Sequence, residues 1–198
     1  GLDLEKPTIL VTFHPETLKT NSAGRDFETL LSALDETENL QMVITKSNAD
    51  TEGRTINGLI DEFVKTRPHA VAQVSLGQKV YLSLLKYVVG VVGNSSSGII
   101  EAPSLKTGTV NIGDRQKGRV RASSILDCEP EVNAIKNAVS RLTDQDFQDA
   151  IRNTDNPHGG GKVSRRIMKI LTEIPLDHLH QKRFYDLPMP FGPERRDP

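Results

Sequence analysis

The chain has 198 residues, which is enough for one α/β domain and short for two. Its 25 Lys and Arg residues almost balance its 26 Asp and Glu residues, so the net charge of −1 lacks the basic excess expected of a nucleic-acid binder. The single cysteine, Cys128, excludes an internal disulfide and argues against a cysteine-based zinc site.

The N-terminus reaches an apolar run within seven residues and lacks the charged, apolar and cleavage-site regions of a signal peptide. The longest apolar runs, such as residues 87–93, are too short to span a bilayer. We therefore expect a cytoplasmic protein with neither a membrane nor a nucleic-acid partner. Because the chain opens on Gly1 without a methionine, we interpret it as a piece of a longer protein.

Short β-branched or apolar runs alternate with stretches of helical spacing along the chain. In chain order, the pattern predicts a strand at 8–13, a helix at 25–36, a strand at 41–45, a helix at 55–65, a strand at 70–74, a helix at 78–86, a strand at 88–92, a helical stretch ending near 105, strands at 109–112 and 124–126, and helices at 131–141, 144–152, 162–173 and 176–185.

This alternation predicts a doubly wound parallel sheet of Rossmann-like type. Residues 88–92 (VVGVV) are the most uniformly apolar run, as expected at the centre of such a sheet. We expect residues 1–186 to form this domain and the proline-dense residues 187–198 to form a mobile tail.

Polar, small or cationic residues directly follow the predicted strands, at 14–16, 47–48, 75–77, 94–98 and 113–115. In open α/β sheets ligands bind beyond the carboxyl ends of the strands. These residues should therefore share the one edge of the sheet that carries the site.

Residues 93–98 (GNSSSG) link an apolar strand to a helical stretch, so backbone N–H groups and hydroxyls gather where the helix begins. Such a turn suits a phosphate or diphosphate, but it also suits a serine N-cap that binds nothing. The segment matches neither G-x-G-x-x-G nor a P-loop, which disfavours hydride transfer and ATP hydrolysis.

Three further features remain open between a functional and a structural role. Glu101 is suited either to accept hydrogen bonds from ribose hydroxyls or to place favourable charge near a helix N-terminus. Residues 113–121 carry four cations and form either an anion site or a solvated basic loop. A lone histidine is more often structural than catalytic, but the position of His14 at the ligand edge favours a functional role, because an imidazole there can transfer protons or donate to a phosphate.

With these residues in view, the chain resembles the C-terminal half of a UDP-N-acetylglucosamine 2-epimerase, of the hydrolysing branch that makes N-acetylmannosamine for sialic acid synthesis. The resemblance covers residues 7–185. Its most specific stretch is 93–128, and the strand-plus-His-Pro start, the loop at 47–50 (SNAD) and residues 183–186 (RFYD) add to it.

The resemblance implies a glycosyltransferase-B (GT-B) type fold of two Rossmann-like domains with the substrate between them. It implies that His14 is the catalytic histidine and that the remaining matched positions bind UDP. Ser95 and Ser96 would contact the diphosphate, with Ser97 and Gly98 completing that turn. The other UDP-binding positions it implies are Glu101 for the ribose, Asn48 and Arg115 for the nucleotide, and Ser75 near the uracil.

The reaction implied is elimination of UDP across C1–C2, followed by addition of water with inversion at C2. The partners implied are the UDP-sugar and the N-terminal domain of the same polypeptide, which would supply the base, so this piece alone is expected to be inactive. A homo-oligomer is left open, and no cofactor or metal is expected. Two alternatives are a GT-B type glycosyltransferase domain and a stand-alone UDP-sugar-binding module.

Overall fold

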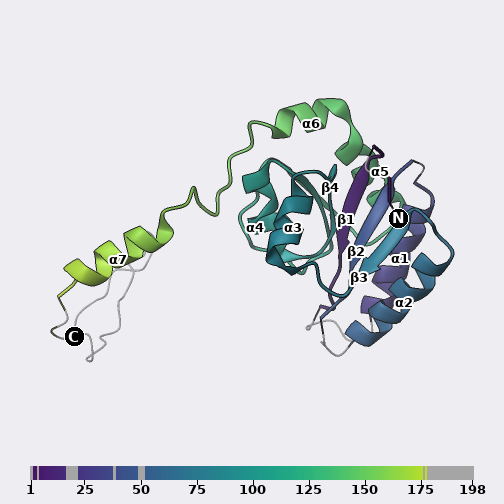
Figure 1. The fold of residues 1–198 in the computed structure, drawn as a ribbon, viewed down its shortest axis with the longest axis horizontal. Coiled ribbons are helices and arrows are strands. Elements are labelled where there is room, and N and C mark those ends of the chain that lie inside the picture. Colours follow the sequence, from purple (N-terminus) through teal and green to yellow (C-terminus); the bar gives the residue numbers. More distant parts are fainter. Residues whose placement is uncertain are drawn as a thin grey trace, which may run out of the picture. The chain divides into compact units, whose positions relative to one another are not determined.

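The computed structural model describes residues 2–3, 5–16, 22–37, 39–48, 52–175 and 177 (Figure 1). The chain divides into two compact units, Gly1–Gly160 and Gly161–Pro198, and each is described here by itself. The tail expected at 187–198 and nearly all of the helix predicted at 176–185 lie outside the described residues.

The first unit is built on a six-stranded sheet in which every neighbouring pair of strands is parallel. The strands are β1 (Thr8–Thr12), β2 (Gln41–Thr45), β3 (Ala70–Gln73), β4 (Gly90–Gly93), β5 (Gly108–Ile112) and β6 (Ile125–Cys128), in the order β3-β2-β1-β4-β5-β6. The predicted Rossmann-like parallel sheet is therefore confirmed. β4 begins two residues later than the strand predicted at 88–92. β6 begins one residue later, and ends two residues later, than the strand predicted at 124–126.

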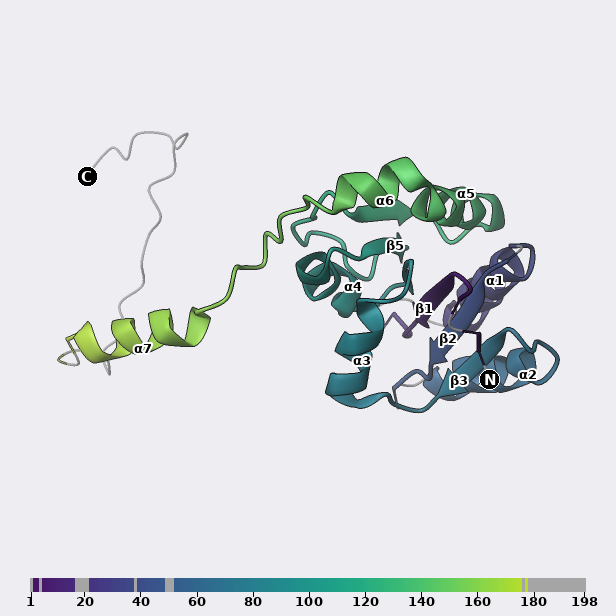
Figure 2. The ribbon, with the colours of Figure 1, turned by 45° about the horizontal axis from the view of Figure 1, so that its top comes forward.

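Helices cover both faces of this sheet, because successive side chains of a buried strand point to opposite faces. Ile9 and Val11 of β1 belong to one apolar cluster, whereas Leu10 belongs to the other. The first cluster lies under α1 (Ala23–Asp35), α2 (Gly53–Lys65), α5 (Val132–Thr143) and α6 (Gln145–Ile151). The second lies under α3 (Gly77–Leu85), and Figure 2 shows α3 on the side of the sheet opposite α1 and α2.

The helical stretch predicted to end near residue 105 is two short helices, α4 (Ser96–Ile100) and the 3₁₀ helix η1 (Ala102–Leu105). Pro103 has no N–H to donate to the carbonyl four residues earlier, so an α-helix cannot continue through it unbroken. Lys106 then ends η1 in a left-handed conformation, with φ 58°. The five-residue α4 has a much smaller dipole than a continuous helix would have.

The strand order reverses direction between β1 and β4: the chain winds outward through β2 and β3, returns to the centre, and winds outward again through β5 and β6. The loops that follow β1 and β4 therefore leave the sheet side by side and lead in opposite directions. Such a topological switch point is where open α/β sheets form their ligand crevice. His14 and Asn94 lie just beyond these two strands.

The second unit contains α7 (Val163–Glu173), close to the helix predicted at 162–173. None of its residues is buried, and its apolar side chains, including Ile167, Ile170 and Leu171, are exposed. Among the described residues, no helix combines the length and the apolar content that crossing a membrane requires.

Candidate functional site

The ends of β1 and β4 approach each other more closely than a side chain would permit. Gly93, the last residue of β4, has φ +140°, and a Cβ built on it would lie 2.0 Å from the carbonyl oxygen of Thr12. Only glycine adopts this conformation without strain and leaves room for the neighbouring backbone. The residue after Gly93 is thereby brought against the loop that follows β1.

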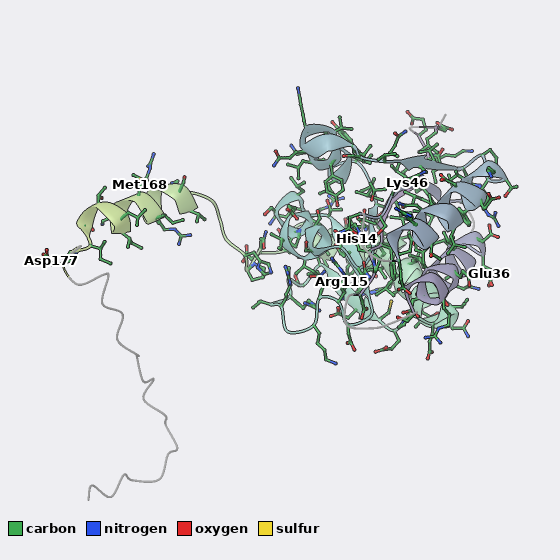
Figure 3. The ribbon with its side chains drawn as sticks, turned by 90° about the horizontal axis from the view of Figure 1, so that it is seen from below. His14, Glu36, Lys46, Arg115, Met168 and Asp177 are labelled. Carbon is green, nitrogen blue, oxygen red and sulfur yellow. The ribbon has the colours of Figure 1, made fainter. Side chains whose placement is uncertain are left out.

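Asn94 occupies that position and is fully buried. Its Nδ2 donates to the carbonyl oxygen of His14 at 2.8 Å, and its Oδ1 accepts from the His14 N–H at 2.8 Å. Its own carbonyl oxygen accepts from Arg115 Nη1 at 3.1 Å and from Gln116 Nε2 at 2.8 Å. Asn94 therefore joins the loops that follow β1, β4 and β5, and Figure 3 shows His14 and Arg115 on the same side of the unit.

The His14 imidazole faces the loop that follows β2. Its Nδ1 lies 3.4 Å from Ser47 Oγ, which in turn lies 3.4 Å from Asn48 Oδ1. The backbone of Ser47 is held by Asn57 of α2, whose Oδ1 accepts from the Ser47 N–H at 2.8 Å and whose Nδ2 donates to its carbonyl oxygen at 3.2 Å. Asn48 thus reaches the His14 region through Ser47.

In the serine turn, residues 95–98, a serine caps the helix, as one of the two alternatives expected. The other alternative, phosphate binding, stays open. Ser95 is the N-cap of α4, and its Oγ accepts from the Ser97 N–H at 3.3 Å. A hydroxyl that accepts one hydrogen bond still has a proton to donate, so capping and phosphate binding are compatible. Ser96 is half-buried, and the backbone N–H groups of the first turn lie beside it.

Gly98 fixes the serine turn against the sheet. A Cβ on Gly98 would lie 2.6 Å from Thr109 Cγ2, and the Thr109 hydroxyl donates to the Gly98 carbonyl oxygen at 2.9 Å. The close packing of α4 on β5 therefore depends on the absence of a side chain at position 98.

Tyr81, which was not among the residues predicted from the sequence, lies next to this turn. The hydroxyls of Tyr81 and Ser97 are both buried, and neither makes a hydrogen bond of normal geometry within the described residues. Burial raises the pKa of Tyr81, and the nearby hydroxyls of Ser97 and Thr12 offset this only in part. Tyr81 accordingly remains a neutral proton donor at physiological pH.

Two of the predicted UDP-binding residues lie at the margin of this cluster. Glu101 ends α4, and its side chain is exposed. Ser75 is exposed beyond the edge strand β3, and its Oγ accepts from the Gly77 N–H at 3.2 Å. Because β2 and β1 separate β3 from β4, strand spacing puts Ser75 roughly 14 Å from the serine turn. Ser75 therefore follows a strand that β2 separates from β1, the strand that leads to His14.

Two of the four cations in the basic loop at 113–121 pair with carboxylates within the loop or close to it. Lys117 pairs with Asp114 at 3.3 Å, and Arg121 pairs with Asp127 at 3.1 Å. The description of a solvated basic loop fits these two cations. Arg115, which bonds to the carbonyl oxygen of Asn94, is the cation that the loop places at the junction.

No group of three or more His, Cys, Asp or Glu residues that could hold a metal ion occurs in the part of the chain that the structure describes. The lone Cys128 thiol on β6 is also poorly suited to chemistry, because burial and the neighbouring carboxylates of Asp127 and Glu129 raise its pKa to about 12. A thiolate is the reactive form, so this cysteine is inert near neutral pH.

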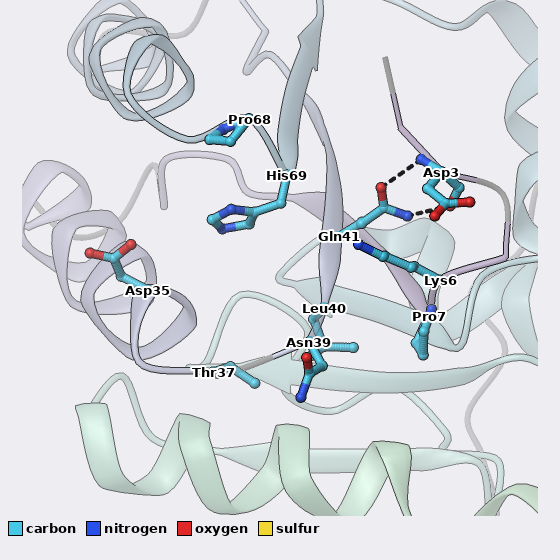
Figure 4. A pocket seen from close by; sticks show the side chains of 10 residues that line it. All are labelled: Asp3, Lys6, Pro7, Asp35, Thr37, Asn39, Leu40, Gln41, Pro68 and His69. Carbon is cyan, nitrogen blue, oxygen red and sulfur yellow. Dashed lines mark hydrogen bonds between the residues drawn. The ribbon is translucent and has the colours of Figure 1, made fainter.

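A hollow of the first unit lies away from this site. It has a volume of about 810 Å³ and is lined by residues that precede or begin β1, β2 and β3, among them Pro7, Gln41 and His69 (Figure 4). Its wall is partly fixed by Gln41, whose Oε1 accepts from the Asp3 N–H at 2.7 Å. This hollow is at the amino ends of the strands, whereas His14, Asn94 and the serine turn follow the carboxyl ends.

Comparison with known proteins decides the family. A family model described as "UDP-N-acetylglucosamine 2-epimerase" matches residues 2–172. The chain belongs to the UDP-N-acetylglucosamine 2-epimerase family. The resemblance stated from the sequence is confirmed at this level.

Two curated relatives are each 38% identical to the chain. One is the "GDP/UDP-N,N'-diacetylbacillosamine 2-epimerase (hydrolyzing)" of Campylobacter jejuni, aligned over 94% of this chain and 48% of its own length. The other is the "Polysialic acid biosynthesis protein P7" of Escherichia coli, aligned over 93% of this chain and 48% of its own length. The chain spans about half the length of the curated relatives it matches.

Solved structures also share this fold. The "S. aureus MnaA-UDP co-structure" superimposes with a TM-score of 0.69 over 85% of this chain and 45% of the other, at 15% sequence identity. At this identity the likeness concerns the fold alone, and it agrees with the expectation of a Rossmann-like fold.

Proposed function

We propose that this chain is the nucleotide-binding half of a hydrolysing UDP-sugar 2-epimerase. Family membership supports the reaction class. The observation that carries the assignment of the site is the junction at Asn94, which gathers a histidine, a serine turn and an arginine at the switch point of the sheet. Donors and a cation converging on one point, without a metal-ligand cluster among the described residues, suit a diphosphate.

In this proposal the hydroxyls of Ser95 and Ser96 and the N–H groups of the turn hold the diphosphate, with Ser97 and Gly98 completing that turn. Arg115 offsets its negative charge. Glu101 binds the ribose, Asn48 contacts the nucleotide, and the outlying Ser75 lies toward the uracil. His14, adjacent to the turn, donates a proton to the departing diphosphate.

The reaction proceeds in two balanced steps. A base removes the proton from C2 of the sugar while the C1–O bond to UDP breaks, which leaves a C1–C2 double bond and UDP. Water then adds its oxygen to C1, and a proton reaches C2 from the opposite face, which yields the free 2-epimer. We assign stabilisation of the departing UDP to this chain and the C2 base to the N-terminal domain of the whole protein, so the chain alone is proposed to be inactive.

The proposed substrate is a UDP-activated 2-acetamido sugar. UDP-N-acetylglucosamine, which would give N-acetylmannosamine for sialic acid synthesis, is the first candidate because the matching family model carries its name. A UDP-linked 2,4-diacetamido-2,4,6-trideoxyglucose is the second candidate, favoured by the name of the 38% identical relative of C. jejuni. Both candidates share the diphosphate leaving group and the C2 proton that the elimination removes.

The test incubates the full-length protein with each nucleotide sugar in deuterated water and analyses the products by mass spectrometry and NMR. We expect UDP and a free 2-epimer that carries one deuterium at C2. Transfer of the sugar to an added acceptor would support a glycosyltransferase instead. UDP binding without any turnover would support a binding module.

A further inference from the structure

Two asparagines of the first unit make the same kind of contact. Asn57 brackets the backbone of Ser47, and Asn94 brackets the backbone of His14, each through one donated and one accepted hydrogen bond. A side-chain amide used in this way replaces the strand neighbour that a residue loses when it leaves a sheet. His14 and Ser47 are adjacent through the 3.4 Å contact between the imidazole and the hydroxyl.

The Asn94 bracket is the stronger of the two. Both of its hydrogen bonds measure 2.8 Å, and Asn94 is fully buried, so water does not compete for them. The bracket also joins residues that are 80 positions apart in the chain, so no local turn could hold His14 in the same way.

The side chain and the backbone of Asn94 act on different parts of the site. The amide group contacts His14, whereas the carbonyl oxygen of the main chain contacts Arg115 and Gln116. Removing the side chain should therefore release His14 and leave the backbone contacts to the cationic loop in place.

We infer that Asn94 is a positioning residue that acts through His14. Its amide fixes the backbone of His14, and with it the imidazole, relative to the serine turn and Arg115. The kinetic part of the test rests on the proposed function, whereas the structural part does not.

The test compares Asn94→Ala, His14→Ala and the double variant in the full-length protein. We expect Asn94→Ala to lower kcat about 10- to 100-fold and to change KM for the nucleotide sugar less than about threefold. In the His14→Ala background the same substitution should cost less than about twofold, because a residue that acts through His14 has nothing left to position. Equal losses in the two backgrounds, or a rise in KM with kcat unchanged, would overturn the inference.

Asn111→Ala is the matched control for general destabilisation. Asn111 is also a buried asparagine, on the neighbouring strand β5, and its Nδ2 donates to Asp127 Oδ1 at 2.6 Å. We expect this variant to lose thermal stability while kcat stays within about twofold of the wild type. If Asn111→Ala lowers kcat as much as Asn94→Ala does, the effect of Asn94 is general and the inference fails.

Hydrogen exchange at the His14 amide, measured in the same proteins, separates the two proposals. In the Asn94→Ala variant the His14 amide hydrogen should exchange more than about tenfold faster than it does in the wild type or in the Asn111→Ala variant. Unchanged exchange overturns the inference whatever the activity. If the wild type turns over neither sugar, the proposed function fails, and faster exchange confined to His14 still supports the positioning role.

Discussion

Ser95 illustrates how one hydroxyl can serve structure and binding at once. Its oxygen caps α4 through the Ser97 N–H, while its proton is available to a ligand. From the sequence alone, helix capping and phosphate binding were alternative roles for this segment, and the geometry makes them compatible. For this reason a single substitution at Ser95 would mix a loss of helix capping with a loss of binding.

We expect Ser95→Ala combined with Ser96→Ala to weaken UDP binding by about 1.5–3 kcal/mol for each hydrogen bond lost to the charged diphosphate. Titration calorimetry with UDP, and with NAD as a ligand control, measures this. Thermal unfolding of the same variant should show the separate cost of the lost cap, about 1 kcal/mol.

Ser123→Ala is the control for this double variant, because the Ser123 hydroxyl pairs with Thr154 and Ser123 is not among the predicted UDP-binding residues. It should bind UDP like the wild type. Unchanged affinity in the double variant would remove the diphosphate assignment.

The prediction of site residues from the sequence depended on their positions after strands. His14 and Arg115 were found because polar residues after apolar runs must share an edge, and the structure joins both to Asn94. Asn94 itself was noted only as part of the serine motif. Its role depends on the β1–β4 pairing, which no local pattern reveals, and the same is true of Tyr81.

At the scale of elements, the packing of α4 on β5 controls where the serine turn lies. Gly98→Ala would place a methyl group 2.6 Å from the buried, β-branched Thr109 side chain, which cannot easily yield. We expect a loss of about 1–3 kcal/mol of unfolding free energy and weaker UDP binding, because α4 must shift. Chemical denaturation and calorimetry measure the two effects.

Gly58→Ala, in the middle of α2, is the matched control, since no atom lies within 4 Å of its added Cβ. This change should stabilise the protein by about 0.5–1 kcal/mol and leave UDP binding alone. Equal behaviour of the two variants would show that position 98 does not constrain the turn.

The C-terminal end of α1 is tied to the start of β3 by an ion pair. Asp35, the last residue of α1, faces the negative end of its own helix dipole, and Arg67 compensates with Nη2 donating to Asp35 Oδ2 at 2.6 Å. The guanidinium also lies 4.2 Å from the centre of the Phe63 ring. The hydrogen bond from Arg67 lowers the pKa of Asp35 below its ordinary value of 3.8.

A lowered pKa in the folded state means that the pair stabilises the protein above pH 4 and that this contribution is lost as the pH falls through the folded-state pKa. Since the Asp35 side chain is 42% exposed, we expect Asp35→Asn to cost less than about 1 kcal/mol at pH 7. In denaturation curves the difference between variant and wild type should shrink as the pH falls below 3.8, because the lowered pKa of Asp35 lies in that range. Glu62→Gln, at a more exposed pair with Lys65, is the control and should change less. A difference independent of pH would contradict the ion-pair explanation.

For the whole molecule, the alternation of apolar runs with stretches of helical spacing was sufficient to predict the parallel sheet, because each strand places side chains against helices on both faces. The strand order was not predictable in the same way, because it depends on which strands pair across long stretches of chain. The break at Pro103 and the position of α7 in a separate unit likewise depend on backbone donors and tertiary contacts that periodicity does not report.

The division at Gly160 leads to a prediction about truncation. The two apolar clusters of the first unit contain no residue of α7, and no α7 residue is buried. A chain ending at residue 160 should therefore unfold within about 2 °C of the 198-residue chain, as measured by calorimetry. A large drop in the unfolding temperature would show that residues 161–198 support the sheet.

The reversal of strand order also has a consequence for how the site is distributed along the chain. The first three strands and the last three come from successive stretches of sequence that meet at β1 and β4. The connection between the two stretches contains α3 and begins with the exposed Val74. A backbone cut between Val74 and Ser75 would leave His14 and Asn48 on one fragment and the serine turn with Arg115 on the other. Neither fragment would hold the whole of the proposed diphosphate site, so recovery of UDP binding on mixing would report that the two halves of the sheet had reassembled.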